Sequence, residues 1–340
     1  MAEIVRTLLV IVALLMSVSG YRLFVGQKCG RVSSLRVRAH SQDDAQSDKT
    51  RIVNSCSDMV GKTGALTSSL LLGNLLTQLQ PAMAAGNQGK ITVIGSNGKT
   101  GKLIVNKLAT AGVPVQPTYA RTPPSSKVEG TLLEPAVCDV TSVSTIESAI
   151  KDSSAVIFAA SASKKGGNAQ AVDYIGVKNI ANECVRLKIP KLVVISSGAV
   201  TRPDSLGFKI TNLFGNIMNY KLDGENAVRD VYANSGLSYA IIRPGGLVGQ
   251  EVDSGKGVAA VELNQGDTIA GEINRADVAE CAIACAQSKT IPERATFEMY
   301  NIASRAALEG KFAENSGYEQ RSSLSYDEMF KGLKNDFNKI

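Results

Sequence analysis

Residues 91 to 102 read Ile-Thr-Val-Ile-Gly-Ser-Asn-Gly-Lys-Thr-Gly-Lys (ITVIGSNGKTGK), and this stretch decides the fold of the chain. Strand-forming residues lead into a loop with regularly spaced glycines, and a helical pattern begins inside the loop. The stretch therefore predicts a strand, a tight turn and a helix. We expect Gly95 to allow the turn, Gly98 to leave room for a pyrophosphate, and Gly101 to let helix and strand pack closely. The helix N-terminus would offer unpaired N–H groups and the positive end of its dipole.

The glycine spacing G-x-x-G-x-x-G, placed after a strand and before a helix, predicts a dinucleotide site, and a plain strand-to-helix turn is the alternative. A nucleoside-triphosphate loop is excluded, because Val93 stands where such a loop needs the glycine that precedes G-K-T by five residues. The loop residues expected to hold the cofactor are Gly95, Asn97, Gly98, Lys99, Thr100 and Gly101.

The composition is that of a globular protein, with 340 residues of which 44% are hydrophobic and 20% charged. Residues 1–85 hold nine basic and five acidic residues, which leaves 28 basic and 26 acidic residues for the remainder. A body so close to neutrality argues against a nucleic-acid partner. The six cysteines form no C-x-x-C pair, so we predict neither a zinc site nor a disulfide framework. Cys281 and Cys285 share a helix face and are expected in the core.

The first 88 residues have the composition of targeting segments. Residues 1–20 contain Arg6 and the uncharged run 7–18, which is typical of a secretory signal peptide. A membrane anchor is the alternative, but the run is shorter than the ~20 apolar residues that a span needs. Residues 21–40 contain five basic residues and no acid, as transit peptides do. Residues 63–89 carry no charge and resemble a signal for transfer across the thylakoid membrane, with a loosely packed helix as the alternative.

These segments predict three parts: a signal peptide at 1–20, a transit-like and thylakoid-transfer-like leader at 21–88, and a folded domain at 89–340. The expected location is a plastid, with stroma and thylakoid lumen both open, and membrane contact only through the removable leader. The single histidine, His40, lies in this leader. Its removal would exclude Ser-His-Asp and Cys-His catalysis and histidine-bound metals, so we predict no metal site.

Residues 89–340 alternate strand and helix, which predicts an α/β domain with a Rossmann-type, doubly wound parallel sheet. The expected strands are 91–94, 113–119, 136–138, 155–160, 192–196, 239–243 and 297–302. The expected helices run to 109 and over 143–150, 172–187, 213–233, 277–286 and 326–333. On the long helix 172–187, the apolar residues Ile175, Ile180 and Val185 are expected to face inward.

The tip of the second strand, Thr118-Tyr119-Ala120-Arg121, favours NADP over NAD. An acidic residue there would take the ribose 2′-hydroxyl, whereas a basic residue accommodates a 2′-phosphate, and no acid occurs between Gly95 and Lys127. Arg121 is expected to pair with that phosphate and Lys99 to add a second cation, with a solvated loop arginine as the alternative. Asp139, after the third strand, is placed either to accept from the adenine amino group or to form a turn.

A resemblance follows from motifs taken together. They are VIGSNGKTG (93–101), Arg121, CDVTS (138–142), VVISSG (193–198), Lys221-x-x-x-Glu225, SYAIIRPGGL (238–247) and NRADVAE (274–280). In order and spacing they resemble the atypical short-chain dehydrogenase/reductases, and among these the plastid NAD(P)-binding proteins of the NmrA-like and Tic62-like kind. The resemblance covers about 91–302. It implies a Rossmann fold with NADP across the carboxyl ends of the strands, with Asp139 and Val140 of CDVTS beside it, and leaves the substrate open.

The resemblance also implies a catalytic set, which is incomplete in this chain. Members of the superfamily use a tyrosine four residues before a lysine and a serine at the end of the fifth strand. Ser196 and Ser197 match the serine and Lys221 matches the lysine, but the tyrosine position is Ile217. Tyr220 is adjacent to the lysine, about 100° around a helix from it, and cannot simply replace a group one turn away.

The remaining site residues have structural alternatives. Lys221 is expected to bond the nicotinamide ribose or to form an i,i+4 surface pair with Glu225. Pro244, Gly245 and Gly246 are expected to bring backbone against the nicotinamide amide or to form a simple turn. Ala160 and Ser161, after the fourth strand, are expected beside the pyrophosphate and ribose.

The sequence thus predicts an NADP-dependent plastid oxidoreductase of unknown substrate that lacks the usual tyrosine. Ser196, Tyr220 or the substrate itself would be the proton source. The alternative is a non-catalytic, NADP(H)-sensing scaffold or assembly factor for a photosynthetic or import complex. The partners expected are the dinucleotide and either a small-molecule substrate or a plastid protein.

Overall fold

The computed structural model describes residues 21–28, 31–39, 89–121, 133–162, 167–213, 215–249, 255–304, 306–307 and 322–336. The chain divides into two units, Met1–Gly86 and Asn87–Ile340. In the first unit, β1 (Tyr21–Lys28) and β2 (Arg31–Ala39) form an antiparallel pair. The predicted signal peptide, His40 and the uncharged segment up to residue 88 lie outside the described residues. Within these ranges, none of the helices is long and apolar enough to cross a membrane.

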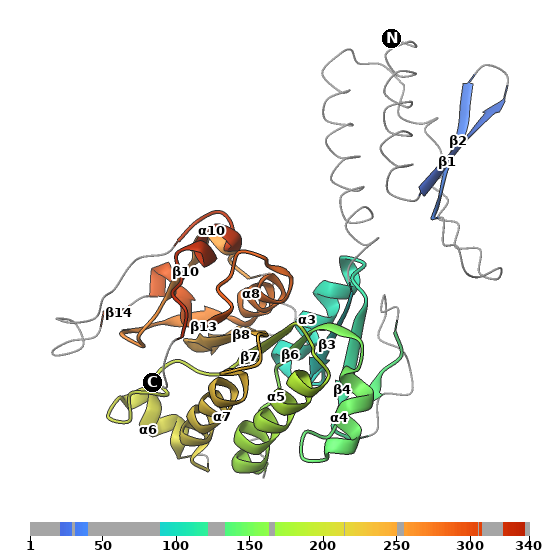
Figure 1. The fold of residues 1–340 in the computed structure, drawn as a ribbon. Coiled ribbons are helices and arrows are strands. Elements are labelled where there is room, and N and C mark those ends of the chain that lie inside the picture. Colours follow the sequence, from blue (N-terminus) through green and yellow to red (C-terminus); the bar gives the residue numbers. More distant parts are fainter. Residues whose placement is uncertain are drawn as a thin grey trace. The chain divides into compact units, whose positions relative to one another are not determined.

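The second unit is built on an eight-stranded sheet (Figure 1). The strands, in spatial order, are β10 (Val261–Asn264), β13 (Arg294–Asn301), β8 (Ser238–Pro244), β7 (Lys191–Ile195), β6 (Ser153–Phe158), β3 (Lys90–Ile94), β4 (Val115–Tyr119) and β5 (Ala136–Val137). Every neighbouring pair is parallel except β10 and β13. The strand order reverses between β3 and β6, which makes the carboxyl ends of these strands the expected ligand crevice. The predicted doubly wound sheet is confirmed.

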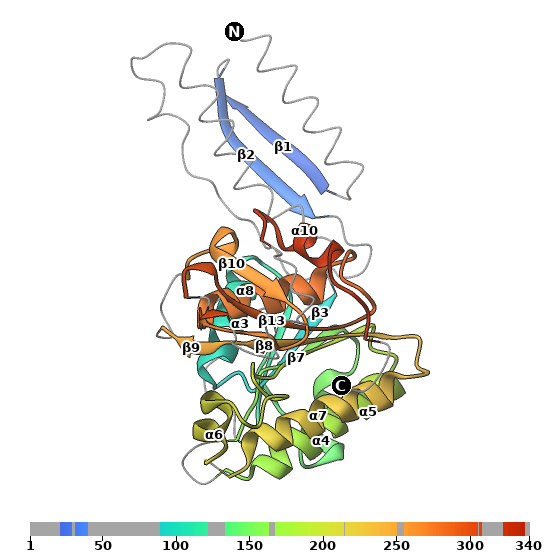
Figure 2. The same ribbon diagram turned by 90° about the vertical axis from the view of Figure 1, so that its left-hand side faces the viewer.

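Helices cover both faces of this sheet (Figures 1 and 2). One face carries α3 (Lys99–Thr110), α8 (Arg275–Gln287) and α10 (Tyr326–Lys331). The other carries α4 (Val143–Ile150), the π-helical segment η2 (Gln170–Gly176), α5 (Val177–Arg186) and α7 (Ile217–Tyr232). Successive strand residues point to opposite faces, so Val93 joins the core under α3 and α8 whereas Ile94 joins the core under α5 and α7. The central strands are buried on both faces, which explains why their sequences are unbroken apolar runs.

Four short strands form two separate two-stranded sheets beside the eight-stranded sheet. The short strand β9 (Gly246–Val248) pairs in parallel with β12 (Glu272–Asn274), and β11 (Ile269–Ala270) pairs antiparallel with β14 (Ala306–Ala307). Single turns of 3-10 helix occur at η3 (Val258–Ala260) and η4 (Ile302–Ser304). The helix α6 (Leu206–Asn212) precedes α7. Sequence periodicity missed α6, β10 and the short strands, because pieces of two to seven residues carry too little pattern.

One inward-facing residue was predicted wrongly. Ile175 is 41% exposed, whereas Ile180 is fully buried and Val185 partly buried. The reason is the π-helical segment η2, whose i→i+5 turns shift the phase of side chains relative to α5. Asp173 and Gly176 are buried in its place. Cys281 and Cys285 are buried in α8, as expected.

Candidate dinucleotide site

The glycine-rich loop turns from β3 into α3 with backbone geometry that side chains would block. Gly95 has a positive φ of 83°, and a Cβ atom there would lie 2.7 Å from the Cα atom of Ala160. A Cβ atom on Gly101 would lie 2.2 Å from the carbonyl oxygen of Gly95. The N–H group of Gly98 donates to that same carbonyl at 3.0 Å. The predicted strand, turn and helix are therefore present, and Gly101 brings the helix close to the loop itself.

The start of α3 is open to an anion. Gly98 is the N-cap residue, and within residues 89–121 no side chain caps the helix and no acid occupies its first turn. Asn97, Gly98 and Lys99 are exposed, and Thr100 is partly exposed. The first N–H groups of a helix without such a cap are the donors that bind phosphate groups.

Two residues that sequence analysis missed fix the loop to the neighbouring strand. The Ser96 hydroxyl donates to the carbonyl of Val93 at 2.9 Å and accepts from the N–H group of Thr118 at 3.0 Å. The Thr118 hydroxyl also donates to Val93, at 2.9 Å. Both side chains are buried. They hold the end of β4 beside the loop, and Arg121 follows two residues after β4 as an exposed side chain.

At the end of the third strand, Asp139 forms a turn. Its Oδ1 accepts from the N–H group of Thr141 at 2.9 Å and from the Thr141 hydroxyl at 2.7 Å. The turn interpretation of Asp139 is thereby confirmed, and a role toward adenine stays a prediction. Val140 is buried against Gly176, where a Cβ atom would lie 2.5 Å from a Val140 methyl group.

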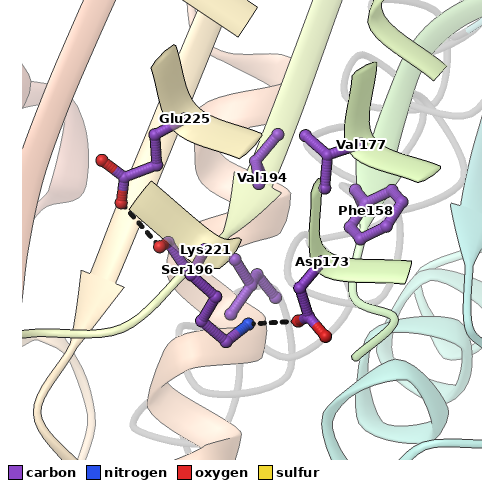
Figure 3. A pocket seen from close by; sticks show the side chains of 8 residues that line it. Phe158, Asp173, Val177, Val194, Ser196, Lys221 and Glu225 are labelled. Atoms are coloured by element: carbon purple, nitrogen blue, oxygen red, sulfur yellow. Dashed lines mark hydrogen bonds and ion pairs between the residues drawn. The ribbon is translucent and has the colours of Figure 1, made fainter. Parts of the chain in front are cut away.

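The loop after β6 is tied to η2 and α7 through Asp173, a residue that sequence analysis did not select. One carboxylate oxygen accepts from the Ser161 hydroxyl at 2.7 Å, and the other accepts from the N–H group of Ala162 at 2.9 Å. The first oxygen also pairs with Lys221 Nζ at 2.9 Å, with side-chain exposures of 12% for the lysine and 1% for the aspartate (Figure 3). Ala160, the neighbour of Ser161, lies against Gly95 of the glycine-rich loop. Lys221 is therefore paired with Asp173 and not with Glu225, the alternative given above, and its contact with the nicotinamide ribose stays a prediction.

Glu225 instead holds Ser196 and two arginines. Ser196 Oγ donates to Glu225 Oε1 at 2.6 Å (Figure 3), and Arg243 donates to both carboxylate oxygens, at 2.6 Å to Oε2. Arg229 donates to Oε2 at 3.2 Å. Burial opposes ionisation of Glu225, but the guanidinium of Arg243 and then that of Arg229 outweigh it and hold its pKa below the ordinary value. The Ser197 hydroxyl donates to the carbonyl oxygen of the neighbouring Gly198 at 3.1 Å.

The buried network continues beyond Arg243. This guanidinium donates to Glu298 at 3.1 Å, and the other oxygen of Glu298 accepts from the N–H group of Asp267 at 3.0 Å. The Asp267 carboxylate accepts from the N–H groups of Ala199 and Thr201, which follow β7. Burial raises the pKa of Glu298 to about 7, with the nearby Asp267 charge acting in the same direction and Arg243 opposing it. The network thus links the loop after β7 to the centre of the sheet.

Ser196, Lys221, Asp173 and Glu225 line one small cavity of about 10 Å³ at the ends of β6 and β7, together with Phe158, Val177, Val194 and Ile195 (Figure 3). Such a volume accommodates about one water molecule. The cavity is therefore too small to enclose a substrate. The cavity shows that polar groups from η2, α7 and β7 meet at the carboxyl edge of the sheet.

Ile217, at the expected tyrosine position, and the nearby Tyr220 lie outside this cavity. Ile217 lies one turn before Lys221 and packs in a small apolar cluster with Val200, Phe208 and Met218. Tyr220 is partly buried and is not among the residues that line the cavity.

The backbone groups of Pro244, Gly245 and Gly246, which connect β8 to β9, form hydrogen bonds within the protein. The Pro244 carbonyl accepts from Gly198 at 2.8 Å, the Gly245 N–H group donates to Met299, and that of Gly246 donates to Gly271. A Cβ atom on Gly245 would lie 2.3 Å from the Gly271 carbonyl oxygen. The simple turn expected for this segment is not what the structure shows, because Pro244 ends β8 and Gly246 begins β9, with Gly245 as the connection between the two strands. Contact with a nicotinamide amide stays a prediction.

A Rossmann sheet whose first strand ends in an open, glycine-lined helix N-terminus defines a dinucleotide-binding protein. The chain belongs to the NAD(P)H-binding family, whose model matches residues 95–289, and within it to the atypical short-chain dehydrogenase/reductases of the Tic62-like kind.

Relatives agree with this assignment, and a solved structure shares the fold. An uncharacterized chloroplastic protein of Arabidopsis thaliana is 28% identical over 232 residues, which cover 64% of this chain and 77% of that protein. Protein TIC 62, chloroplastic, of the same plant is 25% identical over 237 residues, covering 62% of this chain but only 36% of that protein. The structure of ChuY, an anaerobilin reductase from Escherichia coli O157:H7, superposes with a TM-score of 0.52 at 18% identity and covers 64% of this chain and all of ChuY. The last likeness concerns the fold alone.

Proposed function

We propose that the protein is an NADP(H)-dependent oxidoreductase of a plastid. The observation that carries the proposal is the combination of an uncapped α3 N-terminus with two exposed cations, Lys99 and Arg121, at the loop and strand tip that flank it. The helix N–H groups suit a pyrophosphate, and the two cations suit the additional 2′-phosphate that distinguishes NADP from NAD. No acid that would take a ribose 2′-hydroxyl occurs between Gly95 and Lys127.

The proposed cofactor would extend from the adenine end at Asp139 and Val140, past the loop, to the polar groups beyond β6 and β7. Ala160 and Ser161 would border its centre. Ser196 and Ser197 would lie at the nicotinamide end, since they follow β7, the neighbour of β6 at the reversal of strand order. Lys221 would lie there too, because it lines the same cavity as Ser196. The bound dinucleotide would supply hydride chemistry, and the protein would orient it and manage the proton.

The plastid location rests on two observations. The relatives named above are chloroplastic proteins, and the first 88 residues have the composition of a bipartite leader. A fusion of residues 1–88 to a fluorescent protein, expressed in an alga with a complex plastid, should accumulate inside the plastid. Retention in the cytosol would contradict this part of the proposal.

Calorimetric titration tests cofactor choice. Wild-type protein should bind NADPH at least ten times more tightly than NADH, and Arg121→Ala should weaken NADPH binding about tenfold while leaving NADH nearly unchanged, because one charge-assisted bond to a phosphate is worth about 1.5–3 kcal/mol. Lys178→Ala, a lysine on α5 that is exposed and distant from the loop in sequence, is the control. Equal affinities for NADPH and NADH in the wild type would refute the preference.

Turnover is a separate measurement. Purified protein with NADPH and a panel of quinones, flavins and carbonyl compounds should oxidise the cofactor, followed by its absorbance. Inertness toward the whole panel despite tight binding would contradict the oxidoreductase proposal. Partner capture that depends on NADPH would then favour the sensing scaffold.

A further inference from the structure

We propose that Asp173 positions Lys221 as the proton donor of the reduction, in place of the tyrosine whose position is held by Ile217. This inference rests on the proposed oxidoreductase function and names the residue that completes its chemistry. The observation behind it is the buried Asp173–Lys221 ion pair at the carboxyl edge of the sheet. Neither the pairing nor a role for Asp173 follows from any sequence motif.

The other candidate donors at this end of the site are occupied or displaced. The Ser196 proton is directed to Glu225 at 2.6 Å, and that carboxylate is itself held ionised by Arg243. Ile217 offers no proton. Tyr220 does not line the cavity. Among the residues that line the cavity, Lys221 is therefore the proton donor that does not bond to Glu225.

Two carboxylates line the same cavity as Lys221. Asp173 on η2 faces it, and Glu225, one turn further along α7, is compensated by Arg243 from β8 and Arg229 from α7. An ammonium group keeps its protons near neutral pH and has a reference pKa close to that of a phenol, so it can perform the same general-acid step as a tyrosine.

The position of the pair is set by close backbone packing. Gly224 lies against η2, and a Cβ atom on it would come within 2.2 Å of the Asp173 carbonyl oxygen. Asp173 is also anchored to the loop after β6 by Ser161 and the Ala162 N–H group. Three elements therefore converge on one carboxylate, which leaves Lys221 little freedom to move away. A π-helical turn at such a point is a feature often found at functional sites.

The proposed step is balanced as follows. The carbonyl carbon of the substrate accepts a hydride from the reduced cofactor, and the carbonyl oxygen takes a proton from Lys221 Nζ. The C=O π bond breaks, one C–H and one O–H bond form, and the products are the alcohol and the oxidised cofactor. Lys221, now a neutral amine, regains a proton from water. Asp173 exchanges no proton in this step and acts only through the lysine.

The test uses the full chain, NADPH and 9,10-phenanthrenequinone as the carbonyl probe. Lys221→Ala and Lys221→Met, the second of which keeps the aliphatic stem, should lower kcat by about 100-fold or more, because general acid catalysis contributes ~10²–10⁴. The Kd for NADPH, measured by its fluorescence, should change less than about fivefold. Added methylamine should restore part of the kcat of Lys221→Ala. Lys178→Ala is the control and should retain wild-type kcat and Kd.

A double-mutant cycle tests Asp173. Asp173→Asn alone should lower kcat by about 10- to 100-fold, since misplacing a catalytic group by about 1 Å can cost that much. In the Lys221→Ala background the same substitution should have no further effect on kcat, because Asp173 acts through the lysine. Additive losses in the double mutant would overturn the positioning role.

The outcomes separate this inference from the proposed function. A wild type that binds NADPH but oxidises none with any acceptor overturns the oxidoreductase and the inference together. A wild type that turns over, with lysine variants that keep kcat or lose only NADPH affinity, overturns the inference alone and leaves Lys221 as a ribose ligand. Circular dichroism spectra equal to that of the wild type establish that each variant is folded.

Discussion

Gly101→Ala should impair cofactor binding through a steric change that is readable from the structure. The new Cβ atom would lie 2.2 Å from the Gly95 carbonyl oxygen and 2.9 Å from its carbon. Cβ atoms essentially never approach other heavy atoms closer than 3.0 Å, so the start of α3 must move from the loop by at least 0.8 Å. Hydrogen bonds from N–H to oxygen tolerate a range of only about 2.7–3.2 Å. The displacement should therefore break at least one bond to the phosphates.

The magnitude follows from the bond that is lost. A hydrogen bond to a charged group contributes about 1.5–3 kcal/mol, and each 1.4 kcal/mol changes affinity tenfold, so the Kd for NADPH should rise by about tenfold to a hundredfold. The enhancement of NADPH fluorescence on binding measures this directly, and the chain contains no tryptophan that would interfere. Overpacking should also lower the free energy of unfolding by about 1–3 kcal/mol.

Gly207→Ala is the matched control. Gly207 lies in the helix α6, and a Cβ atom there would meet no heavy atom within 4 Å. The substitution should leave the Kd unchanged and raise the free energy of unfolding by about 0.5–1 kcal/mol, because alanine is the better helix former. A Gly101→Ala protein that folds and binds NADPH within twofold of the wild type would refute the assignment of this loop to the phosphates.

Two further predictions concern the buried charges. Glu225→Ala should lower the free energy of unfolding by about 3–5 kcal/mol, because Arg243 and Arg229 lose their carboxylate partner. The control Glu328→Ala, which removes an exposed ion pair, should lower it by less than about 1 kcal/mol. Urea titrations followed by circular dichroism measure both, and similar losses for the two variants would contradict the prediction. Burial raises the pKa of Glu298 from 4.5 to about 7, so between these pH values the folded state binds a proton that the unfolded state does not. The free energy of unfolding should therefore fall as pH rises from 4.5 to about 7. At 1.36 kcal/mol for each unit of pKa shift, the fall should be roughly 3 kcal/mol. Glu298→Gln should remove this slope, and an unaltered slope would assign it to other groups.

Much of the fold was predictable because local pattern reports backbone state and burial. The helix α4 has the predicted bounds, Val143–Ile150, and the apolar runs of β3, β6 and β7 are central buried strands. The glycines at 95 and 101 mark positions where no Cβ atom fits, and this requirement is visible in sequence as spacing. The prediction from apolar periodicity failed at η2, where the helical period changes. The π-helical turn there exposes Ile175 and buries Asp173.

Some features of the site also follow from the sequence, and others depend on tertiary packing. The sequence by itself predicted the Rossmann sheet, the glycine-rich loop and the cations beside it, because each is encoded within a strand, a turn or a helix end. Only the tertiary structure decided that Lys221 forms an ion pair with Asp173, 48 positions earlier in the chain. It also decided that Glu225 accepts hydrogen bonds from Ser196 and Arg243. Such pairings depend on how η2, α7 and the sheet pack against one another. The missing side chain of Gly224 lets α7 contact the backbone of η2 at Asp173. Partner choice among buried charges is a property of that packing, because a carboxylate removed from water must take whichever cation the fold brings within reach.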